Sequence, residues 1–387
     1  MRIIHIIDSF QPKLGYQETF LAREQSALGH DVYVVTSDRY YRDLYNSNRR
    51  LLGERIIGSG FFSEFNINVY RLNVLFEMPP RQFWLIGLEK KIDELKPDII
   101  IVHGIANFSA IRVAKKKNRD KNFKVIFDDH MAFNNSKSKM RFLYPIFKSM
   151  FISSIKSAAD AFVAAGASTQ IFMNIKYGIP LDKITNIPLG VDLKVFRSDI
   201  DARNSIRKKL FIEMDDIIFA YTGKIIPEKR IELLVEAMDY LRNYKRIKIL
   251  IVGEGHSPYV DKIREMIKSY GLEDRFFFHS SVPNEELYKF YSAADIAVWP
   301  SGASISQREA MACSLPIILN EDSLALELLD FNNGYACKRG DASDLAKKME
   351  TLIDKELRQH MGANSRKAAE ENFDWSKLSK KFIDLCI

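Results

Sequence analysis

Between residues 301 and 306, a loop of small polar residues stands where an apolar strand gives way to a helix. Small side chains let backbone N–H groups come close to a ligand. The first N–H groups of a helix lack internal partners and its dipole is positive there, so this corner suits an anion. Glu309 follows one turn later, where a ribose would lie if phosphates occupied the loop. An ordinary strand–turn–helix looks the same, so the loop alone does not decide.

A pair of lysines follows the strand expected at residues 217–221. Gly223 allows a sharp turn, and Lys224 and Lys229 bring two ammonium groups to the entrance of the next helix. Two cations there could neutralise a diphosphate. A basic loop by itself is more often an ordinary solvated surface. The presence of Glu309 farther along the chain favours a diphosphate site for this loop.

Two histidines follow two consecutive strands expected in the first half of the chain. His103 ends the apolar run 97–102, and His130 comes after the run 124–127 and two aspartates. Open α/β sheets bind ligands at these carboxyl ends, although a histidine there is more often structural. Asp128 and Asp129 are adjacent and would point to opposite faces, so they form no Asp-x-Asp metal clamp. The three cysteines are scattered, so we expect neither a metal site nor a cofactor.

The run from Arg308 to Ile318 resembles the signature of the retaining family 4 glycosyltransferases, which have the GT-B fold. Glu309 matches the second glutamate of that signature, which holds the nucleotide ribose in the family. Ser301 stands where the family has its first glutamate, a contact of the donor sugar, and Ser314 stands where it has a glycine. The resemblance therefore implies a nucleotide-sugar site with an altered contact to the sugar.

Other positions match the family in the same way. The resemblance implies that Lys224 and Lys229 grip the donor pyrophosphate, and that His130 reaches the donor sugar. It also implies that Gly15 approaches a donor phosphate in place of a double glycine, and that the loop 280–287 reads the base. The implied catalytic residues are His130, Lys224, Lys229 and Glu309, and the implied donor contacts are Gly15, Gly223, Val282, Ser301, Gly302, Ser304, Ile305 and Ser306.

Apolar runs alternate with helical patterns along the whole chain, as in α/β domains with parallel sheets. The segment 187–196 resembles the family's interdomain linker. We expect an acceptor-binding domain at 1–190, a nucleotide-sugar-binding domain at 191–371, and a tail at 372–387 that returns to the first domain. The resemblance implies two Rossmann-like domains facing each other across a cleft. We also expect a helix at 84–95, and residues 38–70 show no firm period apart from a strand near 66–72.

Composition is that of an ordinary globular protein, with 47% hydrophobic and 28% charged residues in 387. No apolar stretch approaches the ~20 residues of a membrane span and the N-terminus does not read as a signal peptide, so we expect a cytoplasmic protein. Residues 1–190 hold 27 Lys/Arg against 18 Asp/Glu, while the remainder hold 30 against 32. Residues 131–159 lack acids and mix basic with aromatic side chains, which suits either an anionic membrane surface or a solvated face over core aromatics.

These observations favour a retaining transferase that moves a sugar from a nucleotide-diphosphate sugar to a glycan or lipid-linked acceptor, such as a polysaccharide precursor. Its partners are then the donor, the acceptor and an anionic membrane surface at the inner face of the cell membrane, with no nucleic acid. Two alternatives stay open, a degenerate non-catalytic nucleotide-sugar-binding protein and a nucleotide-sugar epimerase of similar fold. A nicotinamide dehydrogenase would need Gly-x-Gly-x-x-Gly after the first strand, which is missing.

Overall fold

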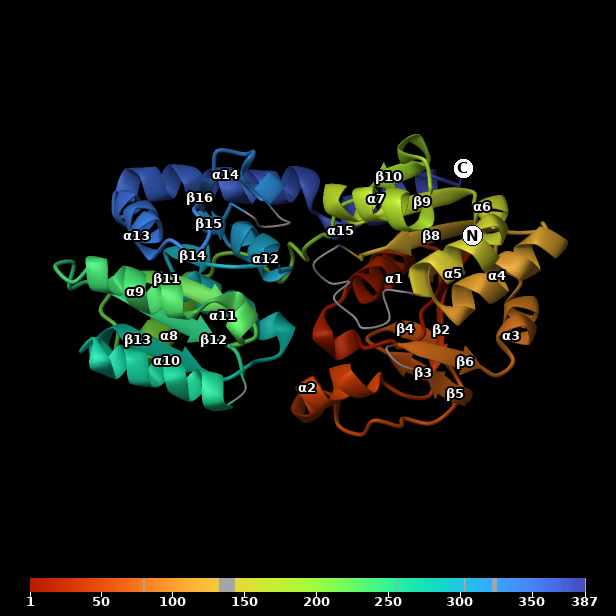
Figure 1. Ribbon diagram of the computed structural model, residues 1–387, viewed down its shortest axis with the longest axis horizontal. Helices are drawn as coiled ribbons and strands as arrows, with labels where there is room; N and C mark the ends of the chain where they lie inside the picture. Colours follow the sequence, from red (N-terminus) through yellow and green to blue (C-terminus); the bar gives the residue numbers. More distant parts are fainter. Residues whose placement is uncertain (79–80, 132–142, 256, 303, 322–325, 387) are drawn as a thin grey trace. The chain divides into compact units, whose positions relative to one another are not determined.

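The computed structural model describes residues 1–78, 81–131, 143–255, 257–302, 304–321 and 326–386 (Figure 1). The chain divides into two compact units. Unit 1 consists of Met1–Leu189 and Trp375–Ile387, and unit 2 consists of Gly190–Asp374. Each unit is built around a parallel sheet with helices on both faces, as the alternating pattern predicts. Among the described residues, no helix is long and apolar enough to span a membrane.

An eight-stranded sheet in the order β10-β9-β8-β7-β1-β2-β4-β3 forms the centre of unit 1. Neighbouring strands run parallel, except that β3 pairs antiparallel with β4. The chain first fills the sheet on one side of β1 and then on the other, and ligands bind open α/β sheets at the carboxyl ends beside such a switch. The strands are β1 (Arg2–Ile6), β2 (Asp31–Ser37), β3 (Gly60–Glu64), β4 (Ile67–Leu72), β7 (Ile99–His103), β8 (Lys124–Asp129), β9 (Ala161–Ala164) and β10 (Ile184–Asn186).

Two apolar cores cover the two faces of this sheet. Side chains of α1 and of the C-terminal helix α15 form one core, and side chains of α3, α4, α6 and α7 form the other. The rings of Phe20 and Trp375 stack at 5.9 Å, so the last helix packs on the first. The helices of unit 1 are α1 (Gln17–Ala27), α2 (Arg42–Leu52), α3 (Leu88–Leu95), α4 (Phe108–Arg119), α5 (Leu143–Met150), α6 (Ile152–Ala158), α7 (Ala167–Phe172) and α15 (Trp375–Asp384), with short turns at Pro12–Leu14, Met173–Tyr177 and Leu181–Lys183.

The secondary structure predicted from the sequence differs from the structure in the first hundred residues. The single helix expected at 84–95 is wrong at its start, because Gln82–Leu85 forms strand β6, which pairs with β5 (Val74–Met78). In this hairpin Phe83 and Leu85 are buried while Gln82 and Trp84 are partly exposed, the alternation of a half-buried strand. The region 38–70, in which only one strand was expected, also contains α2 and β3.

Unit 2 contains a six-stranded parallel sheet in the order β13-β12-β11-β14-β15-β16. The chain moves outward from β11 to β13 and then restarts on the other side at β14, so the switch lies between β11 and β14. A Rossmann-type sheet binds its ligand beside this point. The strands are β11 (Ile217–Thr222), β12 (Ile247–Val252), β13 (Phe276–His279), β14 (Ile296–Trp299), β15 (Ile317–Asn320) and β16 (Gly334–Cys337).

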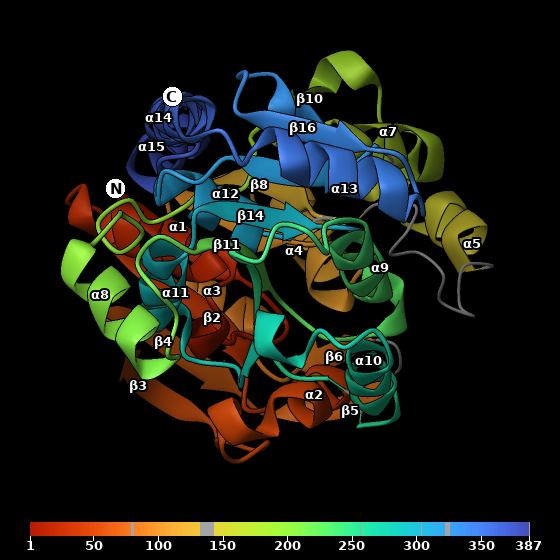
Figure 2. The same ribbon diagram turned by 90° about the vertical axis from the view of Figure 1, so that its left-hand side faces the viewer.

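Helices cover both faces of this second sheet, with α9, α10 and α13 on one side and α8, α11, α12 and α14 on the other (Figure 2). One continuous apolar core holds the layers together. The helices are α8 (Ile200–Lys209), α9 (Glu232–Tyr240), α10 (Ser257–Ser269), α11 (Leu287–Ala293), α12 (Ser306–Ala312), α13 (Ala342–Thr351) and α14 (Lys355–Asn372), with short turns at Pro227–Lys229, Glu273–Arg275, Asn284–Glu286 and Leu326–Leu329.

Candidate functional site

The switch point of unit 2 brings two predicted loops together. Gly223 follows β11, and Trp299 at the end of β14 donates from its indole Nε1 to the carbonyl of Thr222 over 3.0 Å. Gly253, after β12, packs so closely that a β-carbon there would lie 1.9 Å from the carbonyl oxygen of Gly223. The start of the loop at Gly223 therefore packs against the ends of β12 and β14 without a ligand.

Lys229 and Gly302 meet at this corner. A β-carbon on Gly302 would lie 2.8 Å from Nζ of Lys229, and Gly302 has a φ of 76°, which favours glycine. Burial lowers the pKa of Lys229, and the positive charge of Lys224 lowers it further. Two lysines that repel each other beside a glycine loop form a region of positive potential, which an anion would relieve.

The loop before α12 is closed by its own side chains, which the sequence did not indicate. Ser304 N–H donates to Oε1 of Gln307 over 3.3 Å, and Ser306 N–H donates to Oγ of Ser304 over 3.3 Å. Gln307 is fully buried and its Nε2 donates to the carbonyl of Gly302 over 3.2 Å. Ile305 is the residue before the helix. An anion at the N–H groups of Ser304 and Ser306 would have to replace these bonds.

Glu309 lies in the buried wall behind the loop, with only 2% of its surface exposed. Asn284 donates to Oε1 over 2.7 Å, and the hydroxyl of Tyr291 lies 3.3 Å from Oε2. Burial raises the pKa of Glu309 to about 7, although both hydrogen bonds oppose the rise. A ribose that reached this carboxylate would displace the amide of Asn284.

Val282 and Ser301 complete the residues predicted in unit 2. Val282 is partly buried against the core of the unit, two residues before the asparagine that contacts Glu309. Ser301 is partly exposed next to Gly302. The structure thus gathers the loops that carry Gly223, Lys229, Gly302 and Glu309. It adds Asn284, Tyr291 and Gln307, which the sequence reasoning missed because ordinary helix and loop positions give no local signal.

Unit 1 holds a second polar cluster at the carboxyl ends of β7 and β8. His103 Nδ1 lies 3.0 Å from Oδ2 of Asp128, and His130 Nε2 lies 3.6 Å from the same oxygen. Gln17, at the start of α1, donates to this oxygen over 2.8 Å. Burial opposes charge on His130, but the carboxylates of Asp128 and Glu18 outweigh it and raise its pKa to about 9.

A buried chain of rings extends this cluster into the sheet. His5 on β1 lies with its Nδ1 3.0 Å from Nε2 of His103, and its Nε2 lies 2.8 Å from Oε1 of Gln25. Burial lowers the pKa of His5 to about 3, so this ring is neutral. His103, Asp128 and His130 offer ligand atoms within 4.8 Å of one another and could hold a metal ion. Sequence reasoning missed this group because it considered only the adjacent aspartates.

Gly15 lies near the same end of the unit 1 sheet. It ends the short turn Pro12–Leu14 with a φ of 66°, and its N–H donates to the carbonyl of Pro12 over 3.4 Å. Helix α1 begins two residues later with Gln17, the residue that contacts Asp128. Gly15 therefore gives the chain the sharp turn that carries α1 to this cluster.

Two family models match the chain. The model described as "Glycosyl transferases group 1" matches residues 202–368, and the model described as "Glycosyltransferase Family 4" matches residues 19–195. The chain belongs to glycosyltransferase family 4. This confirms the family expected from the run 308–318.

This chain is similar to several known glycosyltransferases. A D-inositol 3-phosphate glycosyltransferase of Xylanimonas cellulosilytica is 27% identical over 239 residues, which cover 60% of this chain and 57% of that protein. A GDP-mannose-dependent alpha-(1-6)-phosphatidylinositol monomannoside mannosyltransferase of Mycolicibacterium smegmatis is 26% identical over 221 residues, covering 53% and 56%. The chain thus spans little more than half the length of these relatives.

Solved structures resemble the family 4 chain over its whole length. Anabaena HepE in complex with UDP has a TM-score of 0.77 at 16% identity and covers 99% of both chains. Sucrose-phosphate synthase from Thermosynechococcus elongatus has a TM-score of 0.73 at 19% identity, covering 99% of this chain and 98% of that one. At these identities the likeness shows the fold, and it confirms the expected GT-B class.

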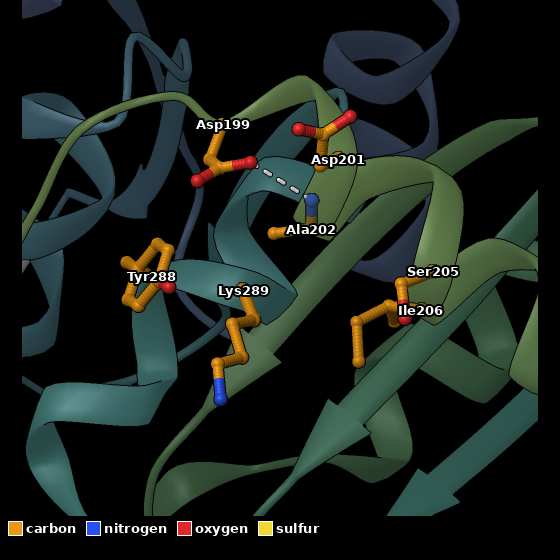
Figure 3. A pocket seen from close by; sticks show the side chains of 7 residues that line it. All are labelled: Asp199, Asp201, Ala202, Ser205, Ile206, Tyr288 and Lys289. Atoms are coloured by element: carbon orange, nitrogen blue, oxygen red, sulfur yellow. Dashed lines mark hydrogen bonds between the residues drawn. The ribbon is translucent and has the colours of Figure 1, made fainter.

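A surface pocket lies between α8 and α11 of unit 2 (Figure 3). None of the site residues predicted from the sequence lines it. Asp199 points across its rim and accepts from the N–H of Ala202 over 2.9 Å, which is a helix cap. Lys289 turns away from it and pairs with Glu286. Asp199 and Lys289 thus have partners in their own segments, and we assign the pocket no ligand.

Proposed function

We propose that the chain transfers a glycosyl group from a nucleotide-diphosphate sugar to an acceptor with retention at the anomeric carbon. The observation that carries the proposal is the placement of Lys229 against Gly302 at the switch point of unit 2, with the buried carboxylate of Glu309 behind the same loop. A cationic glycine corner suits a diphosphate, and a carboxylate with fixed donors suits the hydroxyls of a ribose. Retention is what membership of the family implies.

Electrostatics at this corner supports the reaction as well as binding. When the anomeric C–O bond breaks, negative charge grows on the diphosphate that leaves. In this proposal Lys224 and Lys229 stabilise that charge, and two cations held close together before the reaction would lower the barrier more than they tighten the ground state. His130 is the proposed contact of the transferred sugar, and the N–H groups from Ser304 to Ser306 are proposed contacts of the phosphates.

A nucleotide-sugar panel tests this proposal directly. The protein, incubated with UDP- and GDP-sugars and with D-inositol 3-phosphate or a phosphatidylinositol mannoside as acceptor, should release nucleoside diphosphate and form one glycosylated product. EDTA should not reduce the rate. Binding of a donor without transfer or hydrolysis would instead favour the non-catalytic alternative. The reason to consider that alternative is Ser301, which stands where the family has a glutamate. Loss of activity in EDTA that Mg²⁺ restores would contradict metal-independent transfer.

Substitution of His130 should separate turnover from nucleotide binding. His130→Ala removes the half-exposed ring proposed at the sugar but leaves Lys224, Lys229 and Glu309 in the other unit untouched. We expect kcat to fall by about 100-fold or more, within the range for a positioned polar group, with nearly unchanged affinity for nucleoside diphosphate. Calorimetry with the diphosphate beside steady-state kinetics measures both. An equal loss in both quantities would make His130 structural.

A membrane surface is the proposed site of the acceptor. Within 131–159, residues 132–142 lie outside the described part, including Phe133, Lys137, Lys139, Arg141 and Phe142. On α5, Ile146 and Met150 are 51% and 64% exposed on either side of Lys148, whereas Phe147 packs against the core. Part of the expected aromatic face is therefore core, and two exposed apolar side chains beside a lysine remain for lipid contact.

Vesicle binding should accordingly depend on charge and salt. We expect the protein to sediment with anionic vesicles at low ionic strength and to be released near 0.5 M salt, because each basic residue contributes about 1 kcal/mol and salt screens it. Replacing Ile146 and Met150 by Ser should weaken binding, whereas Ile200→Ser on exposed α8 serves as the control. Equal partitioning to neutral vesicles, or none to either kind, would leave a water-soluble acceptor as the better proposal.

A further inference from the structure

The three ligand atoms at the carboxyl end of the unit 1 sheet have the spacing of a metal site. Distances from Oδ2 of Asp128 are 3.0 Å to Nδ1 of His103 and 3.6 Å to Nε2 of His130. With zinc–nitrogen and zinc–oxygen bonds near 2.1 Å, the ligands of a tetrahedral zinc ion lie about 3.4 Å apart. The two histidine nitrogens lie within 4.8 Å of each other. An ion could therefore enter among these atoms with shifts of a few tenths of an ångström at the aspartate contacts and an approach of the two rings by at most about 1.4 Å.

The outer nitrogen of His103 has a fixed hydrogen-bond partner, as the outer nitrogen of a metal-binding histidine usually has. Nε2 of His103 faces His5, and the far nitrogen of His5 faces the amide oxygen of Gln25. If that oxygen accepts a hydrogen bond, the proton of His5 is on Nε2, and His103 donates from its own Nε2 to His5. The lone pair of His103 Nδ1 then points at the carboxylate of Asp128. A lone pair facing a carboxylate is repulsive unless a proton or a metal ion lies between them.

Two buried oxygen atoms at the cluster give a second and independent reason to expect a cation there. Oδ1 of Asp128 and Oε1 of Gln17 have no hydrogen-bond partner in the part of the chain that the structure describes, and both side chains are at least 97% buried. A buried oxygen without a partner costs about 1–3 kcal/mol, so native proteins rarely keep one without a reason. Both are oxygen donors that belong to the proposed ligand Asp128 and to its hydrogen-bond partner Gln17.

From this geometry we propose that His103, Asp128 and His130 bind a borderline divalent transition-metal ion, for which Zn²⁺ is the probe. Two imidazole nitrogens and one carboxylate suit Zn²⁺ and disfavour Mg²⁺, which prefers oxygen ligands in octahedral geometry. His130 is 37% exposed, so the ion has a path of entry. The site needs no residue of unit 2.

Zinc titration of the full chain, without a histidine tag and at pH 8, tests the site. Alkaline pH is chosen because the metal competes with protons for imidazole, and since the pKa of His130 is raised to about 9 the titration is repeated at pH 9, where binding should be tighter. We expect one Zn²⁺ to bind per chain by calorimetry, Co²⁺ to develop the visible absorption of a tetrahedral complex, and Mg²⁺ to give no signal. His130→Ala should weaken Zn²⁺ binding about tenfold or more. His360→Ala, which removes an exposed histidine of α14, should bind like the unaltered chain.

Asp128→Asn removes the proposed carboxylate ligand and should also weaken Zn²⁺ binding. Because Asp128 is buried, thermal unfolding must first show that this variant folds. If this variant does not fold, the comparison of His130→Ala with His360→Ala decides. Equal zinc affinity in His130→Ala and the unaltered chain, or no stoichiometric binding, would overturn the proposal. An occupied site should also inhibit sugar transfer and EDTA should restore it. That consequence alone rests on the proposed function, because the binding measurements hold whether or not transfer is found.

Discussion

Glu309→Gln should lose most of its activity and yet unfold at a higher temperature than the unaltered protein at pH 8. If Glu309 holds two ribose hydroxyls as proposed, removing its carboxylate costs about 2–4 kcal/mol, so kcat/KM should fall roughly 30- to 1,000-fold. The amide is the same size as the carboxyl group and can still accept from Asn284, so the packing around position 309 should survive.

The gain in stability follows from the raised pKa of Glu309. Burial raises that pKa to about 7 from an ordinary 4.5. As the pH rises between these values the unfolded chain loses its proton while the folded chain keeps it, so the free energy of unfolding falls. This contribution is intact below pH 4.5 and lost above pH 7, on the order of 3 kcal/mol. Glutamine has no proton to lose.

Thermal unfolding between pH 5 and pH 8 measures this effect. The advantage of Glu309→Gln should be roughly 5 °C at pH 8 and should shrink towards pH 5. Glu370→Gln, which changes an exposed carboxylate on α14, is the matched control and should show no such trend. A stability difference that does not change with pH would mean that Glu309 is not held in its protonated form. Unchanged donor affinity would remove Glu309 from the nucleotide site.

Lys229→Ala should produce the second large effect, on nucleoside diphosphate binding. A charge-assisted bond from ammonium to phosphate contributes about 1.5–3 kcal/mol, so affinity should fall roughly 10- to 150-fold and turnover should fall with it. The effect on stability should be small, because burial and the charge of Lys224 disfavour the ammonium at position 229 whereas the carboxylate of Glu228 favours it. Calorimetry with UDP and GDP, together with initial rates, measures the change.

Two further variants sharpen this result. Gly302→Ala places a β-carbon only 2.8 Å from Nζ of Lys229, which would displace the ammonium group, and it strains a φ of 76°, so it should weaken diphosphate binding although it removes no charge. Lys268→Ala removes an exposed lysine of α10 and should leave binding unchanged. A similar loss in Lys268→Ala would point to a general electrostatic effect, and no loss in Lys229→Ala would move the phosphates to another place.

Much of the fold follows from short-range pattern. Buried parallel strands read as continuous apolar runs, as in Ile99–His103 and Ile247–Val252, and each is covered on both faces in the structure. The run 308–318 is equally local, because one strand–loop–helix unit carries the glutamate, the loop and the turn together. Such features survive in a single sequence, since the residues that make them are neighbours along the chain.

The pairing of distant residues was decided by the tertiary structure alone. His5 meets His103 because β1 pairs with β7, 98 residues away, and Gln17 meets Asp128 because α1 begins beside β8, 111 residues away. Asn284 reaches Glu309 in the same manner across two helices. Strand order sets these meetings, and strand order depends on how whole faces are buried, which no local pattern records. The sequence therefore determined the family, the sheet type and the local strand–loop–helix unit that carries Glu309, while packing decided which buried polar groups meet.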